Sequence, residues 1–307
     1  MVATVQQRPD RTIFGVTLVV IAVFLMSIQD TLIKHYSAEI SLWQLFTLRG
    51  SFAVPLLIVA AIATGSRREI WSGAIQKWSV VRSALLVLML AGMYASLPFL
   101  SLSVVAAGIY TAPVFVSLLS AYAINEPVGA RGWFAIVLGF TGVLVILQPG
   151  TDAFSYWTLV PVFGGFLYAA SNIITRSKCQ SVTPAALSLS LQMTFLLVGV
   201  VLSATILWWP PSEVLTNSAP FILSAWSDVS TSEWLLFAGL GVFAIAVSMS
   251  LAGAYQNARP SVVATFDYSY LIFVALWDYL IFATAPSVST TLGIMLIVLS
   301  GLLVLRR

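Results

Sequence analysis

The chain has 307 residues, of which 60% are hydrophobic and 8% are Asp, Glu, Lys or Arg. An ordinary soluble domain carries about 25% charged residues. This composition excludes a water-soluble globular protein.

The scarcity of charge is confined to ten apolar runs. Only six of the 25 formal charges (14 basic and 11 acidic) fall within these runs, and the other 19 lie between them. Each run is close to the ~20 residues that an α-helix needs to cross ~30 Å of hydrocarbon. Strands of a barrel would be about half as long and would alternate polar with apolar residues. We therefore predict an all-α integral membrane protein with ten transmembrane helices, at residues 13–34, 42–64, 80–101, 103–124, 132–148, 156–175, 185–209, 234–255, 261–284 and 287–305.

The positions of Lys and Arg predict the orientation, because both residues are retained on the cytoplasmic side of a membrane. With the N-terminus inside, 12 of the 14 basic residues lie in inner segments or at inner span ends, and Lys34 and Arg49 are the exceptions. We predict a bacterial inner-membrane protein with cytoplasmic N- and C-termini. The net charge of +3 is spread over short loops and does not indicate a nucleic-acid partner.

A single cysteine, Cys179, and a single histidine, His35, exclude an internal disulfide and a Cys- or His-based metal cluster. An enzyme would need a nucleophile–base pair, a metal cluster or paired acids. The sequence has no HExxH, GxSxG or P-loop motif. We predict no metal, no cofactor and no enzymatic activity, with a membrane enzyme as the rival class.

The two halves of the chain match in pieces. A shift of 142 residues pairs Asp30 with Asn172, and a shift of 159 residues pairs Pro127 with Pro286 and places GFTGVLV beside VLSGLLV. Chance similarity among apolar segments is the alternative explanation.

Each half contains five predicted spans, so the second half must enter the membrane from the opposite side. We predict two inverted five-helix repeats, at residues 1–150 and 151–307. Inverted repeats are typical of secondary transporters, in which the two copies exchange conformations to give alternating access.

The third to fifth spans contain Pro113 within the fourth span and Glu126 at its end, followed by a glycine-rich fifth span. The ninth and tenth spans repeat this layout, with Ile272 in place of the proline and Ala285 in place of the glutamate. With these motifs the chain resembles the drug/metabolite transporter superfamily, ten-span EamA type.

The resemblance implies a central cavity lined mainly by spans 1, 3, 4, 6, 8 and 9, with spans 5 and 10 at the periphery. It also implies transport of small organic solutes such as amino acids, vitamins, nucleotide-like metabolites or drugs. A lipid flippase of the same superfamily is the alternative. A channel would be expected to show rings or runs of one polar residue type.

Charges inside the spans are candidate site residues, because each costs at least ~2.5 kcal/mol at the bilayer centre. Asp267 and Asp278 are 11 residues apart and would share one face of a continuous ninth helix, roughly 16 Å apart. Tyr270 and Trp277 fall on the same face. A carboxylate beside aromatic rings predicts a site for an amine or aromatic cation. Hydrogen bonding and packing between helices is the alternative.

Asp30 and Arg49 lie at similar depths in the first two spans. They predict an ion pair at the outer gate, with a permanent structural pair as one alternative and substrate-carboxylate binding by Arg49 as another. Asn172 takes the place of Asp30 in the second copy. Three tyrosines of spans 3, 4 and 6 put hydroxyls at membrane depth as binding or packing groups: Tyr94, Tyr110 and Tyr168.

The sequence thus predicts a secondary transporter of a small organic metabolite, cationic or zwitterionic, that works by alternating access. Asp267 or Asp278 could take up a coupling proton when the substrate leaves. Exchange and facilitated diffusion are equally compatible with the sequence. It specifies neither the substrate, the direction of transport nor the oligomeric state.

Overall fold

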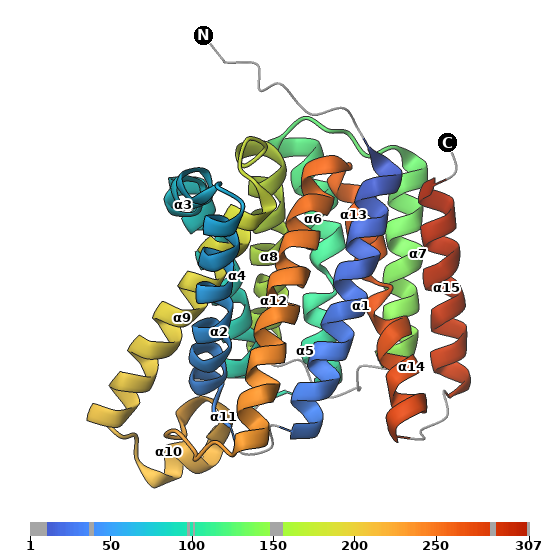
Figure 1. The fold of residues 1–307 in the computed structure, drawn as a ribbon. Coiled ribbons are helices and arrows are strands. Elements are labelled where there is room, and N and C mark those ends of the chain that lie inside the picture. The colour runs from blue at the N-terminus through green and yellow to red at the C-terminus, as the bar shows by residue number, and fades with distance from the viewer. Residues whose placement is uncertain are drawn as a thin grey trace.

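The computed structural model describes residues 11–36, 40–96, 99–100, 102–147, 156–282 and 287–305, and its regular structure is helical throughout these ranges (Figure 1). Each of the ten predicted apolar runs is mainly helical in its described part. The helices are α1 (Thr12–Tyr36), α2 (Leu42–Ala63), α3 (Arg67–Ile75), α4 (Lys77–Ser96), α5 (Leu102–Ile109), α6 (Ala112–Ala123), α7 (Ala130–Leu147), the short 3-10 helix η1 (Tyr156–Thr158), α8 (Leu159–Lys178), α9 (Pro184–Trp208), α10 (Glu213–Ser218), α11 (Pro220–Leu223), α12 (Thr231–Asn257), α13 (Pro260–Asp267), α14 (Tyr270–Phe282) and α15 (Val288–Leu305).

Seven segments of the described chain are long and apolar enough to cross a membrane, or eight if the pair α3 and α4, bent by 62°, forms one span. Helices α6 and α15 are apolar but shorter. The predicted total of ten spans therefore stays a prediction.

Capping residues fix several helix starts. Ser41 accepts a hydrogen bond from the Gln44 backbone N–H at the start of α2, and Thr183 accepts one from Ala186 at the start of α9. Ser230 and Glu233 form a reciprocal capping box at α12. These side chains satisfy backbone donors that have no partner within the helix.

The helices pack side by side, with α7 against α15 at one edge of the bundle and α2 against α9 toward the other. Between them, α1 packs on α12, α4 on α8, and α6 and α13 contact each other. Helix α1 begins and α15 ends on the same side of the molecule (Figure 1). The edge position of α7 and α15 agrees with the peripheral role expected for spans 5 and 10.

Apolar side chains cover the outside of the bundle and polar ones lie within it. Val59, Phe134 and Leu197 are more than 60% exposed, whereas Arg82 and Asn172 are buried. A soluble protein shows the reverse distribution. The outer surface therefore suits hydrocarbon.

Two predicted spans are broken rather than continuous. The fourth is divided into α5 and α6 at Tyr110–Thr111, and the ninth into α13 and α14 at Tyr268–Ser269. The turn at Tyr268–Ser269 separates Asp267 from Tyr270 and Trp277, although Pro260–Ile281 is together long and apolar enough for one span. The face that these side chains were predicted to share is therefore interrupted by a turn.

Candidate functional site

The two helix breaks meet inside the bundle. The Tyr110 ring of the first break lies 6.3 Å from the Tyr268 ring and 6.4 Å from the Tyr270 ring of the second, measured between centroids. At each break a side-chain hydroxyl donates a hydrogen bond to a backbone carbonyl oxygen: Thr111 to Gly108 and Ser269 to Phe266. Irregular backbone at membrane depth is tolerated where it is buried in protein or lines a cavity.

Helix α8 packs directly on the first break. A Cβ atom at Gly165 would lie 2.8 Å from Thr111 Oγ1 and 3.1 Å from the Ile109 carbonyl oxygen. Only glycine permits this approach of one backbone to another. Helix α8 is thereby held against the centre of the molecule.

Asp267 ends α13 immediately before the second break, where it is buried. Its Oδ2 accepts hydrogen bonds from Tyr168 of α8 at 3.2 Å and from Tyr255 of α12 at 3.0 Å. Its Oδ1 is buried and has no hydrogen-bond partner within the described part of the chain. The carboxylate is thus fixed through one oxygen while the other can accept a further hydrogen bond.

Tyr270 and Trp277 face α1 instead. The Tyr270 hydroxyl donates to Asp30 Oδ2 at 2.7 Å, and Trp277 Nε1 donates to Ser27 Oγ at 2.9 Å. The Trp277 ring also lies 5.7 Å from the Phe24 ring. These contacts place the first and last parts of the chain around the same break, with an acid on each side of it.

Arg49 belongs to a separate cluster between α2 and α9. Its guanidinium carbon lies 4.6 Å from the centre of the Phe195 ring and 5.7 Å from that of Phe46. Such stacking stabilises a cation in a buried site. The ion pair predicted between Arg49 and Asp30 stays a prediction.

Two other predicted site residues, Tyr94 and Asp278, have side chains outside the described part of the structure. Asn172 is fully buried on α8, beside the Tyr168 hydroxyl. It lies one turn after Tyr168 on the same helix face.

Arg82 is the residue that sequence reasoning passed over. It is 1% exposed on α4, and its Nε donates to Thr175 Oγ1 of α8 at 2.6 Å. Its place inside an apolar run was the available signal, but its closeness to the inner end of the span had assigned it to the cytoplasmic charges that set orientation. The structure buries it between two helices.

In the last turn of α8, Arg176 forms an ion pair with Glu126 at 2.9 Å and donates to the Gln256 carbonyl oxygen at 3.1 Å. Burial raises the pKa of the neighbouring Cys179 thiol to about 11, outweighing the nearby Arg82 charge and a hydrogen bond with Ser79, which lower it. These contacts join α8, α12 and the segment after α6.

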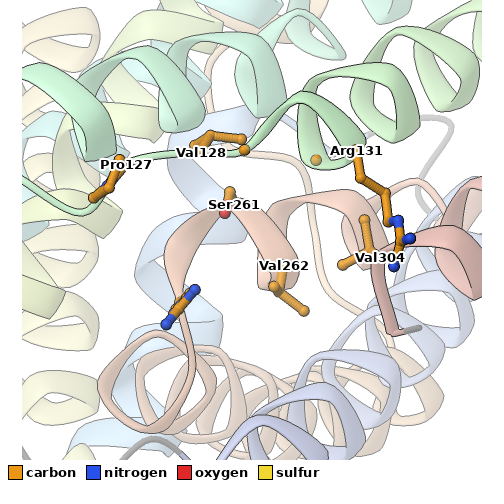
Figure 2. Close-up of a pocket in the computed structure, with 9 residues that line it drawn as sticks. Pro127, Val128, Arg131, Ser261, Val262 and Val304 are labelled. Atoms are coloured by element: carbon orange, nitrogen blue, oxygen red, sulfur yellow. The ribbon is translucent and has the colours of Figure 1, made fainter. Parts of the chain in front are cut away.

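A pocket of about 170 Å³ opens beside this network, between the loop before α7, the first turn of α13 and the end of α15. Figure 2 shows Pro127, Arg131, Ser261 and Val304 around it. None of the predicted site residues lines this pocket. Within the described residues, no three His, Cys, Asp or Glu side chains are grouped so that they could hold a metal ion.

Residues 13–148 match the EamA-like transporter family. The match covers 136 of the 307 residues, and over this part the chain is similar to that family. The resemblance inferred from Pro113, Glu126 and the glycine-rich fifth span is thereby confirmed, and the EamA-like chain is an integral membrane protein.

Curated relatives of this EamA-like chain are named as transporters of small metabolites. The riboflavin transporter of Vibrio cholerae serotype O1 is 27% identical over 62% of this chain, and the match spans only 58% of that relative. The riboflavin transporter of Rhizobium johnstonii is 26% identical over 98% of this chain and 93% of its own length. The pseudopaline exporter of Pseudomonas aeruginosa is 23% identical over 93% of this chain and 94% of its own. A protein of known crystal structure shares the fold, with a TM-score of 0.72 and 15% identity over 96% of each chain.

Proposed function

We propose that the protein is a secondary transporter, not an enzyme, and that it moves a small organic metabolite across the membrane by alternating access. In this proposal ten spans form two inverted five-helix repeats, residues 1–150 and 151–307. The protein lies in a bacterial inner membrane with both termini in the cytoplasm.

The pair of broken helices carries the proposal. The end of α13 and the start of α14 both lie 158 residues after the corresponding points of α5 and α6. The sequence shift that pairs Pro127 with Pro286 is 159 residues, so the breaks occupy corresponding positions to within one residue. Discontinuous helices at corresponding positions in two halves point to the substrate site of a transporter.

Helix packing supports the repeats independently. Exchanging each helix with its counterpart five spans along converts the α1–α12 contact into the α4–α8 contact, and the α6–α8 contact into the α1–α14 contact. The α2–α9 and α7–α15 contacts map onto themselves. Packing of this kind is expected of a pseudo-two-fold arrangement. Helix α1 begins and α15 ends on the same side of the bundle, which supports the placement of both termini on one side of the membrane.

The proposed solute site surrounds the two breaks. Asp267 offers its buried Oδ1 to a hydrogen-bond donor of the solute, with Tyr110 and Tyr168 beside it. We also propose Asp267 as the carrier of a coupling proton. The other proposed site residues are Asp30, Arg49, Tyr94, Asn172, Tyr270, Trp277 and Asp278.

Solute counterflow in proteoliposomes tests the proposal. Riboflavin is the first solute to try, because three relatives are named as riboflavin transporters, followed by amino acids and quaternary amines. We expect one of them to be accumulated against the unlabelled solute inside, with a pH dependence that Asp267→Asn abolishes. Hydrolysis or another chemical change of the solute would contradict transport, and an unaltered pH dependence in the variant would remove the proton role of Asp267.

A further inference from the structure

The Arg82 guanidinium presents a cation inside the bundle that is only partly bound. One of its nitrogens, Nε, donates to the neutral Thr175 hydroxyl. Both terminal nitrogens, Nη1 and Nη2, are buried and have no hydrogen-bond partner among the described residues. The four N–H bonds of these two nitrogens are therefore available.

Burial of this guanidinium without an anion is energetically unfavourable. A guanidinium removed from water loses strong hydration, and a single bond to a neutral hydroxyl does not replace it. The two terminal nitrogens form a planar fork whose geometry matches the two oxygens of a carboxylate or phosphate.

Asn172 is a second buried polar side chain, adjacent to the Tyr168 hydroxyl, and it reaches the same region from α8. It precedes Thr175, the hydrogen-bond partner of Arg82, by one helical turn, so its amide lies on the same face of α8. An amide can donate to an anion and accept from a neighbouring hydroxyl or N–H group of the same ligand. Two buried polar side chains on packed helices thus lie within about one helical turn of the Arg82–Thr175 contact.

We propose that Arg82 and Asn172 form a subsite for an acidic group of the transported solute, a carboxylate or a phosphate. The proposal rests on the transport function proposed above and specifies the solute class. Asp267 takes a hydrogen-bond donor at the other end of the α8 face, where Tyr168 precedes Thr175 by seven residues, or roughly 10 Å along the helix axis. The solute therefore carries an acidic group and a hydrogen-bond donor on the order of 10 Å apart.

Matched probes test the subsite by thermal unfolding of the full chain in detergent. The probes are riboflavin 5′-phosphate against riboflavin, together with succinate and inorganic phosphate at constant ionic strength. A ligand that binds the folded state raises its melting temperature. We expect the phosphate ester to bind at least about tenfold more tightly than riboflavin, as for a charge-assisted bond. Arg82→Gln should remove this ratio and Arg82→Lys should retain part of it, whereas the exposed control Arg68→Gln should keep it.

Cys179 provides a readout in the unaltered protein, so the test does not depend on folding of the variants. The Arg82 charge lowers the pKa of this thiol. An anion bound to Arg82 would offset that effect, so riboflavin 5′-phosphate should slow the reaction of Cys179 with iodoacetamide at pH 9 and riboflavin should not.

Failure of every acidic probe to stabilise the protein or slow the Cys179 reaction would overturn the subsite. So would an acid-to-neutral ratio unchanged in Arg82→Gln. These results are separable from the transport function: counterflow of riboflavin 5′-phosphate that Arg82→Gln leaves intact refutes the subsite alone. Binding of riboflavin 5′-phosphate that depends on Arg82, without counterflow of any solute, refutes transport alone.

Discussion

Replacing Asp267 with Asn separates the stability of the fold from the binding of solute. The carboxylate accepts two tyrosine hydrogen bonds through Oδ2. Each such bond to a charged acceptor contributes about 1.5–3 kcal/mol, against about 1 kcal/mol for a neutral amide oxygen. The variant therefore loses about 1–4 kcal/mol of hydrogen bonding, while removal of a buried charge returns several kcal/mol of desolvation. We expect the melting temperature to stay close to that of the wild type or to rise.

Binding should respond in the opposite direction. A solute donor that would bind Oδ1 loses its charged acceptor in this variant. We expect the dissociation constant of the solute to rise roughly ten- to hundredfold. Asp267→Ala should also destabilise the fold, because it leaves the Tyr168 and Tyr255 hydroxyls buried without their acceptor, at about 1–3 kcal/mol each. Asp228→Asn changes an exposed acid and is the control.

The assay is thermal unfolding in detergent with and without the solute found by counterflow, followed by titration of each variant. Solute affinity in Asp267→Asn equal to that of the wild type would refute the assignment of Oδ1 as a ligand. Equal stability of Asp267→Ala and Asp267→Asn would refute the hydrogen-bond reasoning.

Three further changes probe the neighbouring contacts. Tyr270→Phe removes the donor to Asp30 and should lower the unfolding free energy by about 1.5–3 kcal/mol, measured by thermal unfolding. Arg176→Gln should destabilise by about 3 kcal/mol because it leaves Glu126 without its guanidinium, and adding Glu126→Gln should recover part of the loss in a double-mutant cycle; additive losses would contradict the pairing. Because burial raises its pKa from 9.0 to about 11, Cys179 should carry about a hundredfold less thiolate than an unperturbed thiol and react correspondingly slowly with N-ethylmaleimide at pH 7.5; rapid labelling of the folded protein would contradict this.

The helices could be predicted from the sequence because apolar length is a local property. The run predicted at 42–64 is α2 at Leu42–Ala63, and the run at 185–209 is α9 at Pro184–Trp208. The break in the fourth span also had a local signal, since Pro113 occupies the first turn of α6 and favours a helix start there. At the corresponding point of the ninth span the chain has Ile272, so no such signal exists.

Site residues were harder to predict, because their partners come from distant helices. Asp267 was found by the cost of its charge, but the two tyrosines that hold it lie on α8 and α12. Arg82 was counted with the cytoplasmic charges because the positive-inside rule explains any arginine near an inner span end. Its burial depends on how α4 packs against α8, which hydropathy does not specify.

The position of the second break also depends on a contact with a distant helix, and this contact can be tested. A Cβ atom at Gly139 of α7 would lie 2.6 Å from the Tyr268 ring, so this ring occupies space that only a glycine in the other half of the chain leaves open. Gly139→Ala should displace Tyr268 and the adjoining Asp267, and thereby weaken solute binding beyond any loss of stability.

Gly142→Ala is the matched control, because it makes the same change one turn along α7. Its Cβ would lie 2.8 Å from the Gly293 carbonyl oxygen of α15, away from the break. Both variants should lower the melting temperature by overpacking, at about 1–3 kcal/mol. Gly139→Ala alone should also weaken solute affinity, measured by titration at a temperature where both variants are folded. Equal affinities in the two variants would mean that the packing of Tyr268 on α7 does not position the site.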